Sequence, residues 1–467
     1  MWPKNPKKYL TSQVSIAPLA VFRFLFGFIM LVSIVRFALN GWIHELYVDP
    51  EYFFTFYGFD WVTPLGETGM YVLFLLMGVA ALSVMLGWHY RLGIIFFFLS
   101  FTYVELIDKT NYLNHYYFVS IVSFLLIWVP ANRSFSLDVL RKPNLRRKYV
   151  PAWTINIFKL QLAIVYFFAG AAKLNPDWLF NAMPLRIWLP ASADLPLVGS
   201  LLEYTTTAYI FSWAGALYDL TITFFLLWKP TRIVAYFTVV VFHLLTYFLF
   251  QIGMFPFIMI LSTLIFFSAN LHKKIIASIS GLRTYLPFSF PDTPSTHESQ
   301  FRYSKRITGL ISGLLVIHFA LQLLVPLRFA LYPGNVFWTE QGYRFAWRVM
   351  LMEKAGSITF HITDPESNRR WQVQNWKHLT PNQEKMMATQ PDMILQFAHH
   401  LEDKYRKEGI NNPVIKAESY VTLNGRRSQL LIDPEADLTN ITRGLAHKEW
   451  VLPYNKHQRN WFSGLNE

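Results

Sequence analysis

The stretch VYFFAGAAKLNPDW, which runs from Val165 to Trp178, is apolar until it reaches one lysine, Lys173. An amine held in an apolar pocket loses the water that stabilises its charged form, and a neutral amine is able to act as a general base. The alternative is a lysine whose long side chain reaches the lipid headgroups and keeps its ammonium in water. Spacing alone leaves the catalytic and the structural interpretation open.

Three further ionisable residues, Arg23, Asp219 and His243, lie well inside apolar runs. Such residues are costly in a membrane and are functional candidates by default. For Arg23 and Asp219 the competing interpretation is a buried ion pair that joins two helices, and for His243 it is an interhelical hydrogen bond. A second polar group, with Asn114 and His115 in IDKTNYLNHYY, is expected across from the lysine described above.

The composition indicates a membrane protein. Of the 467 residues, 53% are hydrophobic and only 15% are charged, against about 25% charged in a typical soluble domain. The net charge of +13 is spread over short clusters between apolar runs, which argues against nucleic-acid binding. The absence of cysteine excludes disulfides, cysteine-ligated metals and thiol nucleophiles, and the sequence shows no cluster of metal ligands.

About nine apolar runs approach the roughly 20 residues that a helix needs to cross the hydrocarbon core. They are residues 14–39, 69–88, 90–107, 115–130, 152–172, 207–228, 231–250, 252–270 and 307–326.

The charges between these runs predict their orientation. Lys and Arg gather in the N-terminal segment and in the loops after the fourth, sixth and eighth runs, whereas residues 40–68 contain none. The positive-inside rule therefore places the N-terminus in the cytoplasm and the C-terminal region outside it. We expect an integral membrane protein in contact with membrane lipids and, because cysteine is absent, a bacterial cytoplasmic membrane. The many aromatic residues of the 40–68 loop are typical of a belt at headgroup level, with a lid over a site as the alternative.

Beyond Pro326 the chain becomes polar. An Asn-Gly pair at 424–425 lies between two strand-like runs and predicts a hairpin. The segment TPNQEKMMATQPDMILQFAHHLEDKYRKEG predicts one amphipathic helix that ends at a glycine. The expected fold class is therefore a polytopic α-helical membrane domain, residues 1–329, followed by an extracytoplasmic α+β domain, residues 330–467.

The chain resembles the vitamin K-dependent gamma-glutamyl carboxylases and the bacterial relatives that share their horizontally transferred transmembrane domain. The resemblance covers essentially the whole chain and consists of several motifs in order. Besides the lysine stretch they are LAVFRFLFGF, DKTNYLNHYY, ANRSFSLD, YDLTITFFLLW, FHLLTYFLFQIGMFPF, NVFWTEQGYRFAWRVML and LIDPEADL.

The resemblance implies a coupled reaction. In the family a reduced naphthoquinone reacts with O2 and leaves as its epoxide, and this drives removal of a glutamate γ-proton and addition of CO2. The implied cofactor is reduced vitamin K or a menaquinol, with O2 and CO2 as co-substrates and no metal. The implied partners are the lipid-soluble quinol and a glutamate-containing protein or peptide. The protein must first deprotonate the hydroquinone, whose phenol titrates near the tyrosine value of about 10.

The resemblance also implies roles for particular residues. Lys173 would deprotonate the hydroquinone, and His115 would deliver a proton at the glutamate carbanion. Five further residues match positions that approach the ligands. These are Asn114, His243 and Tyr343 for the quinone, and Trp338 and Trp347 for the glutamate.

The chain departs from the animal enzymes at two points. Ala172 precedes the lysine where they carry a second lysine, and the sequence ends at Glu467, without the long extension that helps to handle propeptide-bearing substrates. We therefore expect propeptide recognition to be absent or different. Two other functions remain open: a quinol epoxidase without peptide carboxylation, and a non-enzymatic quinone- or lipid-binding protein or transporter. A transporter would be expected to show inverted repeats, and the sequence shows none.

Overall fold

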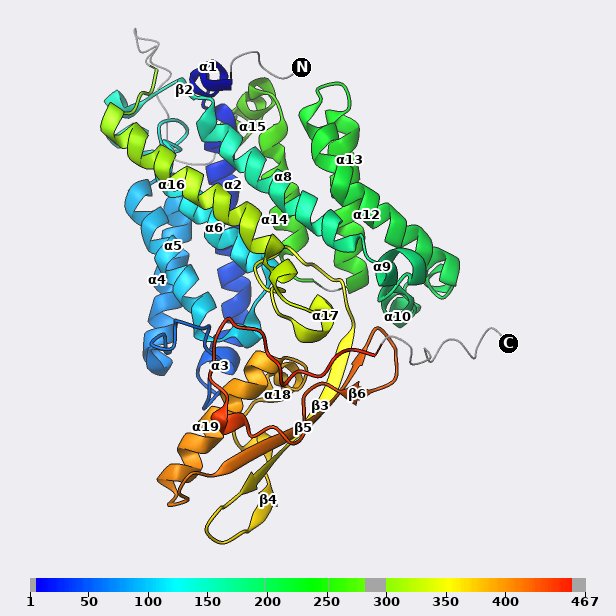
Figure 1. Ribbon diagram of the computed structural model, residues 1–467. Coiled ribbons are helices and arrows are strands. Elements are labelled where there is room, and N and C mark those ends of the chain that lie inside the picture. Colours follow the sequence, from blue (N-terminus) through cyan, green and yellow to red (C-terminus); the bar gives the residue numbers. More distant parts are fainter. Residues whose placement is uncertain (1–5, 197, 251, 282–299, 456–467) are drawn as a thin grey trace.

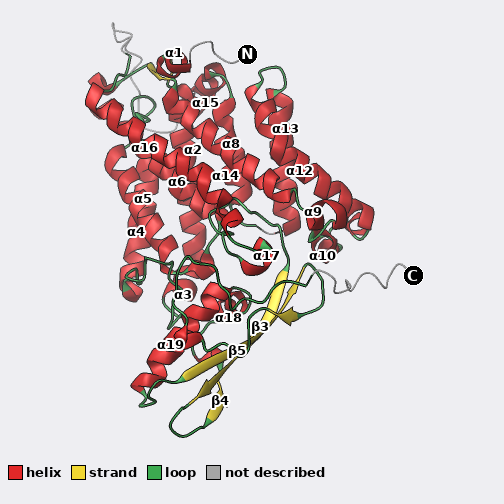
Figure 2. Cartoon of the chain, in the orientation of Figure 1, coloured by secondary structure: helices red, strands yellow, loops and turns green. Residues whose placement is uncertain are grey.

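The protein is described by a computed structural model that covers residues 6–196, 198–250, 252–281 and 300–455. A bundle of helices forms one part, and a smaller domain of helices and strands covers one end of it (Figure 1). Figure 2 shows that the longer strands all belong to this second part, which we call the C-terminal domain. The boundary at residue 329 stays a prediction.

Seven of the described helices are long and apolar enough to cross a membrane. They are α2 (Ala17–Leu39), α4 (Gly66–Leu86), α5 (Tyr90–Ile107), α8 (Trp153–Lys173), α12 (Thr205–Leu227), α13 (Arg232–Phe250) and α16 (Lys305–Leu324). The two remaining apolar runs form the shorter helices α6 (Asn114–Trp128) and α14 (Phe255–Thr263), the latter extended by a 3-10 turn to Phe266. Together they give the polytopic helical protein that the composition predicts.

The basic loops lie at the end of the bundle opposite the C-terminal domain (Figure 1). There, strand β1 (Gln13–Ser15) pairs with β2 (Tyr149–Pro151), which brings the N-terminal segment beside the basic loop after α6. Tyr149 also bridges to Gln300, just before α16. Lys4 and Arg283 of the basic clusters lie outside the described residues. The separation fits the charge rule, but the side of the membrane on which each end lies stays a prediction.

Helices α8 and α12 approach closely where α8 carries its run of small residues. A Cβ atom added at Gly170 would lie 2.8 Å from the backbone nitrogen of Leu220, so only glycine permits this contact. Small residues at helix crossings have this effect in membrane bundles. The close approach brings the end of α8 against the middle of α12, where the candidate site lies.

The C-terminal domain has a four-stranded antiparallel sheet in the order β4-β3-β5-β6. The strands are β3 (Lys354–Thr363), β4 (Arg370–Gln372), β5 (Val414–Leu423) and β6 (Gln429–Leu430). Phe360 of β3 packs on Phe397 of helix α19 (Pro391–Lys407), with ring centroids 5.2 Å apart. The hairpin predicted from the Asn-Gly pair is confirmed, because Asn424 and Gly425 have positive φ angles of 53° and 69° between β5 and β6.

The single amphipathic helix predicted over residues 380–409 is wrong in one respect, because the segment forms two helices. Helix α18 (Pro381–Met387) begins with a capping box between Thr380 and Gln383, and α19 begins at Pro391. Proline lacks the N–H that a continuous helix would use and fits the first helical position, so it starts a new helix. The positive φ of Gly409 ends the second one as predicted.

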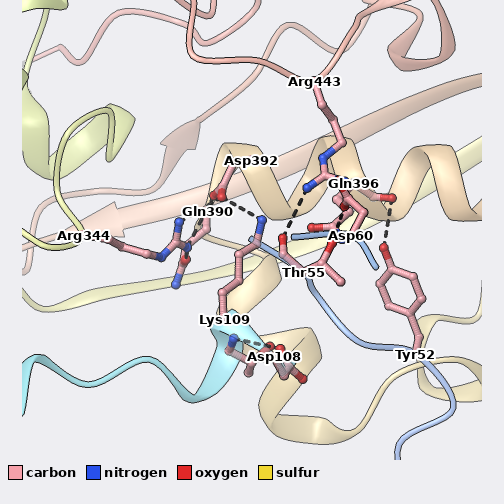
Figure 3. A network of polar contacts seen from close by, with 11 residues as sticks. Tyr52, Thr55, Asp60, Asp108, Lys109, Arg344, Gln390, Asp392, Gln396 and Arg443 are labelled. Atoms are coloured by element: carbon pink, nitrogen blue, oxygen red, sulfur yellow. Dashed lines mark hydrogen bonds and ion pairs between the residues drawn. The ribbon is translucent and has the colours of Figure 1, made fainter. Parts of the chain in front are cut away.

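Polar contacts join the C-terminal domain to the bundle, and Figure 3 shows one group of them. Lys109, in the turn between α5 and α6, donates to Asp392 at the start of α19 (2.8 Å), and Arg344 donates to the same carboxylate (2.9 Å). Asp108 accepts from Gln383 of α18 (2.9 Å). The DKT sequence therefore holds the C-terminal domain on the bundle.

A second contact lies on the other side of the C-terminal domain. Asp177, in helix α9 (Pro176–Asn181), accepts hydrogen bonds from Arg426 (2.8 Å) and Asn424 (2.9 Å) at the β5–β6 turn. The turn after the lysine stretch therefore serves as a docking point for the hairpin.

The aromatic 40–68 loop also takes part in this interface. Phe54 is fully buried, and the ring of Tyr52 lies 5.9 Å from that of Phe397 in the C-terminal domain. The hydroxyl of Tyr52 donates to the backbone oxygen of Gln396 (3.2 Å, Figure 3). Part of the loop thus packs against the C-terminal domain.

Replacing Asp392 by asparagine is expected to lower the free energy of unfolding by about 3 kcal/mol. The change leaves Lys109 and Arg344 without their shared carboxylate, and breaking a buried pair costs about 3–5 kcal/mol; the lower end applies because the Asp392 side chain is 32% exposed. The effect is measured by heating the protein in detergent and using the rate of proteolysis of the C-terminal domain to monitor unfolding. Asp403→Asn on the same helix is the control, since that side chain is 70% exposed and such pairs contribute little.

The loss of stability expected for Asp392→Asn should depend on pH. Although burial alone would raise it, Arg344 and Lys109 hold the pKa of Asp392 well below its usual value. A carboxyl group with a lowered folded-state pKa stabilises the protein above its unfolded-state value of about 3.9, and that stability is lost as the pH falls further. The difference between wild type and Asp392→Asn should therefore shrink below about pH 4. An equal difference at pH 3 and pH 7 would contradict this role.

Candidate functional site

Lys173 ends α8 as a buried residue with 6% exposure, and it forms an ion pair with Asp219 of α12. The distance from Lys173 Nζ to Asp219 Oδ2 is 2.6 Å, and both side chains are less than a tenth exposed. Nζ also lies 3.4 Å from the backbone oxygen of Ala169. The amine does not reach outward to lipid headgroups, so the snorkelling interpretation of this lysine is wrong.

The residues after Lys173 close the space around its amine. Asn175 caps α9 by accepting from the backbone N–H of Trp178 (3.0 Å). The indole of Trp178 then lies under the lysine, with Nζ 5.3 Å from the ring centroid, and its N–H donates to the backbone oxygen of Ser212 on α12 (2.8 Å). The sequence NPDW thus supplies a helix cap and an aromatic wall.

A small apolar cavity of about 100 Å³ lies beside this ion pair, between α8, α12, α13 and α14. His243 of α13 lines it, and the Nε2 atom of this histidine lies 3.1 Å from the hydroxyl of Tyr166. The second ring nitrogen, Nδ1, is buried without a partner in the described part of the chain. An orphaned buried nitrogen next to a cavity is a place where a ligand oxygen would be bound.

A larger cavity of about 1120 Å³ lies between the bundle and the C-terminal domain. Asn114, His115 and Tyr343 line it, together with charged residues of both parts. The cations in its wall are Arg36, Lys109, Arg344, Arg348, Lys354 and Lys385, and the carboxylates are Glu340 and Glu353. The wall therefore favours a negatively charged ligand.

The charged groups of this wall are strongly influenced by burial. Burial lowers the pKa of Lys109 to about 8, although its partner Asp392 acts in the opposite direction. Burial likewise lowers the pKa of Lys354, against the effect of Glu340 at 3.0 Å, and that of Arg348.

The two cavities share four wall residues: Ile252, Phe255, Val349 and Met350. The ring of Phe255 lies between the two candidate histidines, with its centroid 5.7 Å from that of His115 and 5.6 Å from that of His243. An apolar space with an amine and a polar space with cations therefore meet at a thin wall of side chains.

The structure separates some residues that the sequence analysis placed together. Arg23 does not pair with Asp219: its guanidinium donates to the backbone oxygens of Val84 (2.6 Å) and Ala131 (3.2 Å). It therefore ties α2 to the ends of other helices, and the predicted Arg23–Asp219 pair is wrong.

The three predicted quinone ligands are divided between the cavities. His243 lies beside Lys173, whereas Asn114 and Tyr343 line the larger cavity. The Asn114 amide already accepts from the Tyr112 hydroxyl (3.1 Å) and donates to the backbone oxygen of Arg348 (2.9 Å). It therefore positions the segment around residue 348.

Trp338 and Trp347 line neither cavity. Trp338 is buried and donates its indole N–H to the backbone oxygen of Leu452 (2.8 Å). Trp347 is fully buried, and its ring stacks on Tyr117 with centroids 4.9 Å apart. Trp338 therefore packs within the C-terminal domain and Trp347 packs against the bundle, and a direct contact of either with glutamate stays a prediction.

Two residues of the site were missed by the sequence analysis. Tyr166 precedes the lysine by two helical turns and holds His243. Arg348 follows Trp347 in the run FAWRVML, where a lone charge among apolar residues is a signal in its own right.

The fold and the site together define an integral membrane protein whose helical bundle and C-terminal domain enclose an apolar and a cationic cavity side by side. The HTTM domain family matches residues 12–271, more than half of the chain, and the vitamin K-dependent gamma-carboxylase lumenal domain matches residues 307–457. The chain belongs to the vitamin K-dependent gamma-glutamyl carboxylase family. No solved structure gives a significant match.

Membership supports a carboxylase-type function that depends on vitamin K. Among the described residues, no group of three or more His, Asp or Glu side chains is arranged to hold a metal ion.

Proposed function

We propose that this protein is a vitamin K-dependent gamma-glutamyl carboxylase that couples epoxidation of a reduced naphthoquinone to carboxylation of a peptidyl glutamate. The observation that carries the proposal is the buried Lys173–Asp219 pair in an apolar cavity that shares a wall with a larger, cation-lined one. A lipid-soluble quinol suits the first environment and a charged glutamate suits the second. Orientation with the C-terminal domain outside the cytoplasm is part of the proposal.

The chemical character of the residues around the small cavity suits a hydroquinone. Apolar side chains offer contact with the ring, and Lys173 and the unpartnered Nδ1 of His243 offer polar contacts for its oxygens. The space of about 100 Å³ is below the roughly 300 Å³ at which ligand pockets usually begin. The ring therefore needs part of the adjoining cavity as well, reached past Phe255 and Met350. When bound, the quinol supplies, with O2, the basicity that no side chain possesses.

Lys173 takes the proton of the hydroquinone at its Nζ atom in this proposal. For Nζ to accept this proton it must be a neutral amine at that step, and Asp219, 2.6 Å away, is the group placed to hold the proton that Nζ gives up. The neutral amine has a lone pair and is a general base. Once protonated, the ammonium would stabilise the negative charge that the proton transfer leaves on the ligand. Trp178 and the other apolar wall residues exclude water from this step.

His115 acts on the other side of the shared wall. Its ring packs between Tyr116, 4.5 Å away by centroids, and Phe255. It forms no hydrogen bond with another described residue, so its nitrogens remain available for proton transfer at the glutamate. Its position in the larger cavity supports the role that the family resemblance implies.

One assay tests the proposal. Purified protein receives reduced vitamin K, O2, labelled bicarbonate and a short glutamate peptide, and both the epoxide and the label fixed in the peptide are measured. We expect both products. Epoxide without fixed label would indicate a quinol epoxidase, and the absence of both would indicate a non-enzymatic membrane protein.

A further inference from the structure

Arg348 is a buried arginine whose guanidinium has no polar partner in the described part of the chain. The residue is only 6% exposed, and its Nε atom is buried without a hydrogen bond. Its contacts are with two aromatic rings: the guanidinium carbon lies 4.4 Å from the centroid of Phe329 and 5.5 Å from that of Phe337. A buried charge without a counter-ion is unfavourable, so such a group points to an anion that is bound during function.

Three of the other cations that line the larger cavity have carboxylate partners, and Arg348 differs from these three. Lys109 and Arg344 share Asp392, and Lys354 pairs with Glu340 at 3.0 Å and also donates to the backbone oxygen of Trp338. Their positive charge is compensated within the protein. The charge of Arg348 is not compensated by any described carboxylate.

The surroundings of Arg348 place it next to the proposed chemistry. Asn114 donates to its backbone oxygen (2.9 Å), and Asn114, His115 and Arg348 all line the larger cavity. Val349 and Met350, the next two residues, belong to the wall shared with the cavity of Lys173. The backbone of Arg348 is therefore tied to the helix end that presents the histidine.

We propose that Arg348 binds the side-chain carboxylate of the glutamate that is carboxylated. The inference rests on the proposed function, because of its reactants only the glutamate is an anion, whereas the quinol, O2 and CO2 are neutral. A guanidinium is planar and offers paired N–H groups that match the two oxygens of a carboxylate.

This contact would also assist the reaction itself. When the Cγ–H bond breaks, the proton goes to the base that quinol oxygenation provides, and its electron pair forms the new C–C bond to CO2. Between these events a second negative charge lies beside the carboxylate. A guanidinium on the carboxylate oxygens stabilises that additional charge where it develops. Arg348 thus contributes to binding and to proton removal.

The test measures equilibrium binding of two fluorescent peptides that differ only in one side chain, glutamate or its neutral analogue glutamine. The wild-type protein in detergent is expected to prefer the glutamate peptide by about 10- to 100-fold, the value of a charged hydrogen-bonded contact. Arg348→Met should bind both peptides with similar affinity, and Arg348→Lys should keep part of the preference. Lys385→Met is the matched control, because that cation lines the same cavity and its loss changes the net charge equally. The Lys385 side chain is exposed, so water and salt screen its charge, and the preference of this variant should stay close to that of wild type.

The outcomes separate this inference from the proposed function. An unchanged preference in Arg348→Met would overturn the role of Arg348, even if wild type carboxylates the peptide. A preference lost in Arg348→Met but kept in Lys385→Met supports it, even if wild type forms no carboxylated product, in which case only the proposed function fails. No preference in wild type would also overturn it.

Discussion

Replacing Lys173 by alanine is expected to slow epoxide formation by about 10²–10⁴-fold, the contribution of a positioned general base. The amine is the group that takes the hydroquinone proton in the proposed function, whereas His243, which lines the same cavity, is assigned through its unpartnered Nδ1 to binding a quinol oxygen. The measurement is epoxide formed per minute by purified variant and wild type at saturating quinol. Because carboxylation depends on this step, fixed label in the peptide should fall in parallel.

A loss of folding has to be separated from a loss of chemistry. Lys173→Ala leaves Asp219 without the partner that lies 2.6 Å away, and an unpaired buried carboxylate destabilises a protein by several kcal/mol. The double variant Lys173→Ala/Asp219→Asn removes that charge and should recover thermal stability but not epoxidation. Lys173→Arg keeps a positive charge opposite Asp219 but cannot give up its proton. It should fold and remain inactive.

Rescue by an added amine gives a further check. A small primary amine supplied to Lys173→Ala should restore part of the epoxidation at high pH, where its neutral form is present. A stable Lys173→Ala protein with wild-type epoxidation would contradict the proposed base.

The helical architecture could be predicted because it follows from local properties of the chain. Each of the nine apolar runs forms a helix, since length and hydropathy alone decide whether a segment is stable in lipid. The hairpin at Asn424 and Gly425 was equally predictable from the sequence, because positive φ angles at both positions are a local requirement. The break before Pro391 was also signalled in the sequence, and the strong amphipathic pattern on both sides concealed it.

The arrangement of the site was less predictable from the sequence. Which side chains of the site pair with one another depends on which helices are in contact. The sequence of one span shows its polar residues but not the residues that lie next to them in the fold. Asp219 pairs with Lys173 because Gly170 lets α8 and α12 approach, whereas Arg23 finds backbone oxygens. The division of His115 and His243 between two cavities likewise depends on Phe255, whose ring contacts both histidines although His115 is far from the other two in the sequence. Motifs pointed to the candidate residues but not to their distribution over two cavities.

Replacing His115 by alanine is expected to lower the ratio of carboxylated glutamate to epoxide by about 100-fold or more, the lower end of the range for loss of a proton-transfer group. A group placed to return a proton to the glutamate Cγ is, by microscopic reversibility, also placed to assist the removal of that proton, which carboxylation requires. The reason the ratio changes is the shared wall. His115 lies in the larger cavity with Arg348, whereas Lys173 lies in the smaller one, so the variant should leave quinol deprotonation largely intact. Both products are measured in the same reaction, which makes the ratio independent of enzyme concentration.

The control for this variant is His318→Ala. His318 is a histidine of α16 that lies 2.9 Å from Gln161 and lines none of the cavities described here, so its loss should leave the ratio unchanged. If His115→Ala reduces epoxide and carboxylated peptide equally, the histidine is needed before the two half-reactions diverge, and the two cavities do not divide the chemistry. If only carboxylation falls, the wall at Phe255 separates quinol activation from glutamate chemistry, and the shared residues Phe255 and Met350 are where the two must communicate.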